Sequence, residues 1–139
     1  MYEPIRTGPS RRSVHTMADT RDFPHRSREE ELDIQLAGHL AALLAVTDEL
    51  RALAPAEELD EAAEELSRQV ARLRGGLPPV RSAVASAIHE PHATALHQRA
   101  HALAGRALVV AASRADTAAA ILAARRMEAH ASAGDLVTA

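Results

Sequence analysis

The residues best suited to chemistry are histidines near the middle of the chain. The run His89-Glu90-Pro91-His92 is followed by His97 and His101. Two imidazoles four residues apart lie on one face of a helix and can share a metal ion. Helix bundles commonly hold metals between facing helices. The sequence therefore raises the hypothesis of a metal site at His97 and His101.

Helical spacing also supports a plainer interpretation of these histidines. His97 and His101 lie about 100° and 140° around a helix from Leu96, at the flank of the apolar face. Metal sites in bundles use Glu-x-x-His motifs on two helices, and this sequence contains no such motif. His39 is expected at the border of an apolar stripe, not as a third ligand. We expect hydrated or hydrogen-bonded histidines and no resident cofactor, with the metal site as the alternative.

Carboxylates and hydroxyls show no catalytic arrangement. Eight of the 16 acidic residues of residues 29–139 cluster near the starts of two predicted helices, where they compensate the helix dipole. Glu90, Asp116 and Glu128 lie outside those groups, and nothing in the sequence pairs them. The sequence has no Gly-x-Ser-x-Gly elbow, no glycine-rich phosphate loop and no cysteine. We expect a protein that is not an enzyme.

Residues 1–28 differ in composition from the rest of the chain. They contain six of the 16 basic residues, three of the seven prolines and both aromatic residues, without a periodic apolar pattern. We expect a disordered arm here and a single helical domain over residues 29–139. Met17 could start a shorter reading frame, so residues 1–16 could be an upstream extension.

The arginines of this arm could contact phosphates, which makes nucleic-acid binding an alternative function. Residues 29–139 contain 16 acidic residues against ten arginines. No predicted helix has a basic recognition face. Binding of nucleic acid is therefore not our first expectation.

The overall composition indicates an all-α protein. Apolar residues make up 47% of the chain and aromatic residues only 1%, and the chain contains 32 alanines and 16 leucines. Alanine and leucine are the best helix formers. No apolar run approaches the length of a membrane span or of an export signal, so we expect a cytoplasmic protein without a membrane segment. All 16 basic residues are arginine, which together with the alanine excess is typical of high-GC bacterial genomes.

In the first half of the predicted helical domain, we expect two helices, over residues 29–53 and 56–74. Ser27 and Glu30 have the spacing of a capping box. Pro55 ends the first helix and suits the start of the second. The first helix has a wide apolar stripe, which predicts a central helix with two neighbours, and the second has a narrow seam. The stripe is formed by Leu32, Leu36, Leu40, Leu43, Thr47 and Leu50, and the seam by Leu59, Ala63, Leu66, Val70 and Leu73.

The second half predicts helices over residues 79–112, kinked at Pro91, and 115–131. Gly75 to Pro79 forms the clearest turn in the chain. A continuous helix through residue 114 would put Arg114 in the apolar seam, so we expect a break at residues 113–116. The fourth helix carries Ala118, Ile121, Leu122 and Arg125, and Gly134 is expected to stop it. The complete prediction is an antiparallel four-helix bundle. The alternative is one helix over residues 92–131 in an elongated dimer.

The abundance of alanine bears on function. Residues 29–139 contain 31 alanines against 27 larger aliphatic residues, and alanine contributes little to a core beyond one methyl group. The last two helices carry alanine on more than one face, which favours contact with another surface. We expect a non-catalytic protein that acts by self-association, most simply as a two-fold dimer through the third or fourth helix, or by binding a protein partner.

Overall fold

Within the part of the chain that the structure describes, four helices account for the fold. The computed structural model describes residues 26–81 and 90–138, without the side chains of 90, 91 and 135–138. The helices are α2 (Arg28–Leu53), α3 (Glu57–Leu73), α4 (Glu90–Arg114) and α5 (Thr117–Thr138). The predicted all-α bundle is confirmed. Residues 1–25 of the predicted arm lie outside the described residues.

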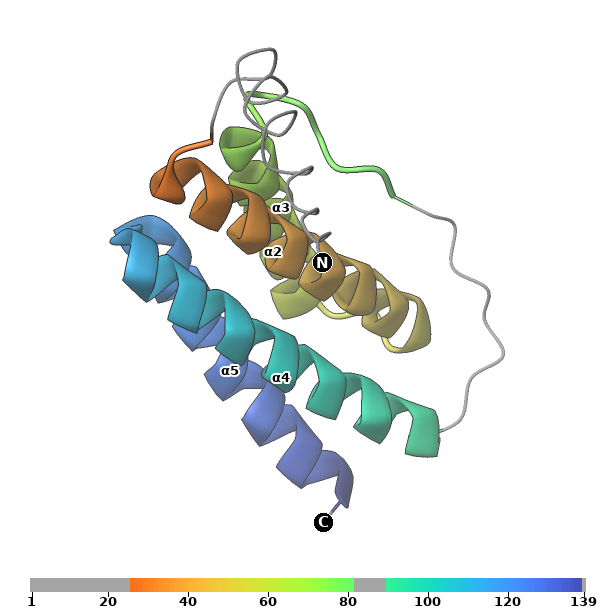
Figure 1. The fold of residues 1–139 in the computed structure, drawn as a ribbon. Helices are drawn as coiled ribbons and strands as arrows, with labels where there is room; N and C mark the ends of the chain where they lie inside the picture. The colour runs from red at the N-terminus through yellow and green to blue at the C-terminus, as the bar shows by residue number, and fades with distance from the viewer. Residues whose placement is uncertain (1–25, 82–89, 139) are drawn as a thin grey trace, which may run out of the picture.

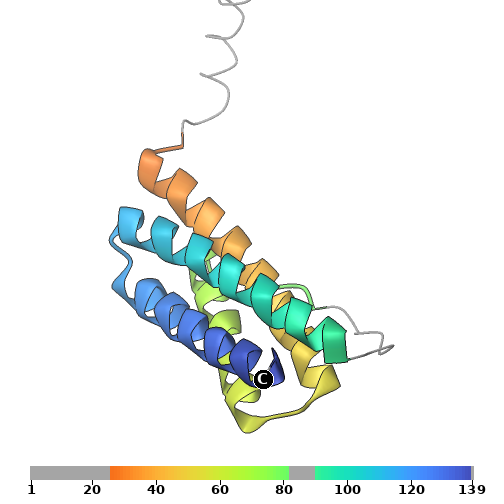
Figure 2. The same ribbon diagram turned by 90° about the horizontal axis from the view of Figure 1, so that it is seen from below.

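The helices form two antiparallel hairpins, α2 with α3 and α4 with α5, stacked on each other (Figures 1 and 2). α2 packs against both α3 and α4, which confirms its central position, while α5 packs mainly against α4 and less against α3. Arg114 at the end of α4 pairs with Asp33 at the start of α2, so these two helices are antiparallel. Arg72 near the end of α3 pairs with Asp116 at the start of α5, which makes that pair antiparallel too.

The segment after α3 crosses back along the bundle. Figure 1 shows it in green, leaving α3 and running toward the start of α4. Arg81 in this segment donates two hydrogen bonds of 2.8 Å to the carboxylate of Asp48, in the C-terminal part of α2. Burial acts to raise the pKa of Asp48, but the hydrogen bonds from Arg81 and Arg51 outweigh it and lower the pKa below its usual value. The pair therefore ties the crossing segment to α2.

The predicted signals at the ends of α2 are present in the structure. The Ser27 hydroxyl accepts from the Glu30 amide at 3.1 Å, and the Glu30 carboxylate accepts from the Ser27 amide at 2.8 Å. The capping box satisfies two amides that the first turn leaves unpaired. At the other end, α2 stops at Leu53, two residues before Pro55.

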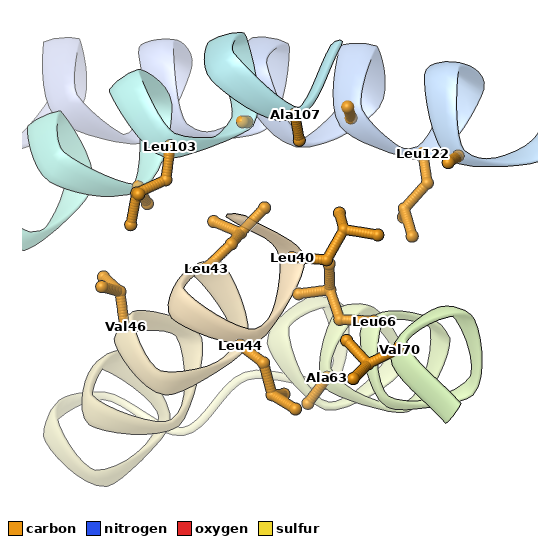
Figure 3. Packing of buried hydrophobic residues seen from close by; sticks show 14 of the residues in the cluster. Leu40, Leu43, Leu44, Val46, Ala63, Leu66, Val70, Leu103, Ala107 and Leu122 are labelled. Carbon is orange, nitrogen blue, oxygen red and sulfur yellow. The ribbon is translucent and has the colours of Figure 1, made fainter. Parts of the chain in front are cut away.

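The core combines large side chains of α2 with small side chains of α4. Leu36, Leu40 and Leu43 of α2 are fully buried. The core face of α4 contains Ala100, Ala104, Ala107 and Ala111, also fully buried. Figure 3 shows leucines of α2 pointing toward α4 and α5, with Leu66 and Val70 of α3 closing the core on the other side. Small residues on one helix let the leucines of its neighbour fill the space between the backbones.

The third helix begins later than predicted. Residues 79–81 are not helical, and residues 82–89 lie outside the described part of the chain. In the described residues α4 starts at Glu90, which puts Pro91 in the first turn of the helix as described. Proline fits there because amides of the first turn have no helical partner to lose and its φ is already helical. The predicted start at residue 79 is therefore wrong. The predicted kink at Pro91 depends on residues 82–89, which lie outside the described residues.

The predicted break between the last two helices is confirmed, and one continuous helix over residues 92–131 is excluded. Ala115 adopts φ +59°, a left-handed conformation that ends α4. Asp116 then caps α5 by accepting from the Ala119 amide at 3.1 Å.

α5 differs from the prediction in its length and in its buried face. The helix continues through Gly134 to Thr138, so the expected stop at Gly134 and the end at residue 131 are wrong. Gly134 faces α4, where an added Cβ would meet the Cβ of His97 at 4.0 Å. Leu122 is buried as expected, but Ile121 is 52% exposed. None of the helices in the described ranges is both long and apolar enough to span a membrane.

Candidate functional site

Two polar residues of α5 lie on its buried face. Arg126 and His130 are only 4% and 2% exposed. Nη1 of Arg126 donates to the carboxylate of Glu58 on α3, and Nη2 lies 3.1 Å from Nε2 of His130. Nδ1 of His130 lies 3.0 Å from Nδ1 of His97 on α4. We call Glu58, Arg126, His130 and His97 the polar chain; it joins three helices.

The chemistry of these groups fixes where the protons of the polar chain lie. A guanidinium can only donate, so Nε2 of His130 must accept from Arg126. A neutral imidazole carries one proton, which on His130 is then on Nδ1. This proton is donated to Nδ1 of His97, whose own proton is therefore on Nε2. Every donor in this series points from Arg126 toward His97.

The surroundings keep both imidazoles neutral. Burial, followed by the charge of Arg126 and by His97 and His101, lowers the pKa of His130 to about 3. Burial and Arg126 also lower the pKa of His97, and the opposing effect of Glu58 does not compensate. Desolvation disfavours the charged form of an imidazole, and a neighbouring cation disfavours it further. The pKa shifts agree with the neutral forms required by the hydrogen bonds.

The structure places the two predicted metal ligands in different roles. Nδ1 of His97 accepts from His130, and the two rings are 5.2 Å apart between centroids. His101 lies one helical turn further along α4, half-buried, and acts on His130 through its charge. The described residues contain no group of three or more His, Asp or Glu placed to hold a metal ion. The metal site at His97 and His101 stays a prediction from the sequence.

The remaining candidate residues also have identifiable places. His92 lies 3.8 Å from a Glu49 oxygen, His39 is half-buried on α2, and His89 lies outside the described residues. Asp116 is a helix cap and pairs with Arg72 at 2.8 Å. Glu128 is exposed.

Sequence reasoning missed Arg126 and His130. Both follow Leu122 at intervals of four residues, which places them on its side of the helix. That spacing could have predicted that Arg126 and His130 share the buried face of Leu122. The prediction instead grouped Leu122 with Ala118, Ile121 and Arg125, all three of which the structure leaves exposed.

A second candidate site is an apolar surface around the turn between α4 and α5. Ile121 projects from it, 52% exposed. Ile121 also lines one side of a shallow hollow of about 300 Å³, whose other walls are mainly alanine side chains of α4 and α5. We call this surface the Ile121 face; its exposed residues are Ala112, Ala115, Thr117, Ala118, Ile121 and Ala124. Val109, 66% exposed, lies one turn before Ala112 on the same side of α4.

Charges at the edge of the Ile121 face are paired within the chain. Asp116, which lines the hollow, accepts a hydrogen bond from Arg72. Burial would raise the pKa of Asp116, but the hydrogen bonds from Arg72 and the Ala119 amide outweigh it and lower the pKa. Arg125 pairs with Glu65 of α3 at 3.1 Å. The face is therefore apolar at its centre and electrically balanced at its edge.

Comparisons of this chain with protein-family models, with curated proteins and with solved structures find no match.

Proposed function

We propose that the protein acts by self-association instead of catalysis, as a two-fold dimer joined through the Ile121 face. The observation that carries this proposal is an exposed isoleucine standing next to an alanine-lined hollow on one surface. In a two-fold interface the same surface meets itself, so each copy must offer both the projection and the recess. The Ile121 face offers both.

Alanine on this face allows close approach of two copies. Helix axes pack at distances set by the side chains between them, and small residues permit the shortest separations. Placing Ile121 of one copy in the hollow of the other would remove both apolar surfaces from water, with a gain that scales with the area buried.

The distribution of charge favours a second copy at this face over contact elsewhere. Residues 29–139 have 16 acidic residues against ten arginines, so two copies repel each other on average. At the Ile121 face, Asp116 and Arg125 are both neutralised within their own chain. An apolar, balanced patch on an acidic molecule is where two copies meet at the lowest electrostatic cost.

The test is the oligomeric state of the full chain as a function of concentration, by sedimentation equilibrium up to about 100 μM. We expect a dimer whose dissociation constant rises at least about tenfold in Ile121→Glu, because that variant places a charge in the apolar contact. Ile34→Glu is the matched control. Ile34 is an isoleucine of α2 that is 49% exposed, nearly the same as Ile121.

A wild-type chain that is monomeric over the whole range contradicts the proposal. Equal weakening of the dimer by Ile34→Glu and Ile121→Glu also contradicts it, because the contact would then not lie at the Ile121 face. Loss of helix signal in Ile121→Glu would be seen by circular dichroism. In that event Ala124→Glu, on the same face, replaces it.

A further inference from the structure

The polar chain has only one arrangement of protons that satisfies its hydrogen bonds. An added proton on His97 would go to Nδ1, which faces the Nδ1–H of His130 at 3.0 Å. An added proton on His130 would go to Nε2, which faces the Nη2 group of Arg126 at 3.1 Å. In either position two donors would face each other, and a hydrogen bond would be replaced by repulsion.

The groups around the imidazoles offer no compensation for an added charge. His130 is faced by His97 and His101 from α4 and by Arg126 from its own helix. From α3, Glu58 is the carboxylate that acts on His97, and it is already bonded to Arg126. Among the described residues, the added proton would therefore meet mainly cationic or proton-donating neighbours.

Between Arg126 and Gly134, α5 offers little apolar contact with α4 besides Met127. The fully buried apolar residues of α5 end at Ala123, and Met127 is partly buried against the same core. After Arg126, its described side chains other than His130 and Glu128 are small, except Met127, which packs near Gly105 of α4. Gly134 approaches His97 itself. The N-terminal half of α5, in contrast, is fixed by the buried residues Ala119, Leu122 and Ala123.

We propose that the polar chain is an acid-sensitive switch, in which protonation of His130 or His97 separates residues 127–134 of α5 from α4. The rest of the bundle keeps its apolar core. This inference is independent of the Ile121 face, which lies at the other end of α5.

The experiment is amide hydrogen exchange of the full chain between about pH 7 and about pH 5, corrected for the intrinsic exchange rate. We expect the equilibrium constant for opening of residues 127–134 to rise by up to about tenfold for each unit by which the pH falls, because one proton is taken up on opening. At each pH these residues should open more readily than Ala119–Ala123 of the same helix. Equal opening of both halves would overturn the proposal, because only unfolding of the whole helix would then be present.

Variants separate the switch from general acid sensitivity. His130→Gln retains an oxygen that can accept from Arg126 and an amide that can donate to His97, but it does not titrate. We expect a smaller dependence on pH in His130→Gln. We expect no change in His92→Asn, the control, which alters an exposed histidine of α4, the helix that carries His97. An undiminished pH slope in His130→Gln would overturn the proposal.

A second measurement needs no variant. The ¹⁵N shifts of the imidazoles of wild-type protein at neutral pH should show the proton of His130 on Nδ1 and that of His97 on Nε2. A proton on Nε2 of His130 would contradict the proposed order of hydrogen bonds. If His130→Gln does not fold, His97→Asn, whose side-chain oxygen can accept from His130, serves in its place in the exchange experiment.

Discussion

At the scale of single residues, Arg126 stands out as a cationic side chain buried in the bundle. Its guanidinium is buried, and its Nε has no hydrogen-bond partner in the described structure. Glu58, its ionic partner, keeps 57% of its side chain exposed. The two ends of this ion pair therefore have unequal access to water, and their removal should have unequal effects.

We predict that Glu58→Ala lowers the free energy of unfolding by about 2 kcal/mol, because it leaves a buried cation without its carboxylate. Arg126→Met should cost less, since the exposed Glu58 can hydrate and methionine can fill the space, and losing one donor to the neutral His130 costs less than leaving a buried cation unpaired. Urea denaturation measures both. Glu65→Ala is the control, with an expected loss below about 0.5 kcal/mol, because its partner Arg125 is exposed. A larger loss of stability in Arg126→Met than in Glu58→Ala would contradict this prediction.

The low pKa of His130 predicts how stability depends on pH. Its pKa is about 3 in the folded protein and about 6.5 in an unfolded chain, so the unfolded state binds more protons between these values. The free energy of unfolding should therefore fall as the pH falls below about 6.5, by up to about 1.4 kcal/mol per pH unit from this group. Urea midpoints at several pH values measure the slope, which should be smaller in His130→Gln. An equal slope in both proteins would contradict the assignment.

At the scale of elements, the turn between α4 and α5 decides the shape of the second hairpin. Ala115 accepts a left-handed backbone without being glycine, and Asp116 follows it as a cap. An alanine in this conformation is strained because its Cβ lies too close to the neighbouring carbonyl. The strain is local, so its relief should leave the helices in place.

We predict that Ala115→Gly raises the free energy of unfolding by about 1 kcal/mol. The same change inside a helix, Ala102→Gly, should lower it by about 1 kcal/mol, because glycine is a poor helix former. Ala102 is exposed on α4 and so provides a control without loss of packing. Thermal or urea unfolding compares the two. A decrease in both variants would mean that Ala115 is not strained.

At the scale of the whole molecule, different interactions join different pairs of helices across the two hairpins. α2 and α4 share the apolar core, while ion pairs such as Arg125 with Glu65 join α3 and α5. The Ile121 face adds an apolar surface at the outer side of α5. A second copy on that face would add contacts that a single chain lacks.

This arrangement predicts that stability depends on protein concentration. If folded chains dimerise and unfolded chains do not, the midpoint of thermal unfolding should rise with concentration in wild-type protein. In Ile121→Glu the midpoint should be nearly constant. Differential scanning calorimetry over about a hundredfold range of concentration tests this expectation, with Ile34→Glu as the control that should behave like wild type.

Some features were predictable because they depend on neighbours in the sequence. The composition determined the helical fold, the capping box determined the start of α2, and Arg114 indicated the break before α5. Each follows from local propensity or from the spacing of apolar residues along one helix. The wide stripe of α2 also correctly placed that helix between two neighbours.

Other features were decided by contacts between distant segments. The polar chain joins Glu58, His97 and His130, and no pattern along the chain shows that α3, α4 and α5 bring these residues together. Gly134 stays helical where it faces α4, although glycine alone favours a stop. The sequence determined which segments coil and which faces are apolar, because those depend on short-range geometry. Only the tertiary structure decided which polar groups are buried together, because burial depends on the neighbouring helix.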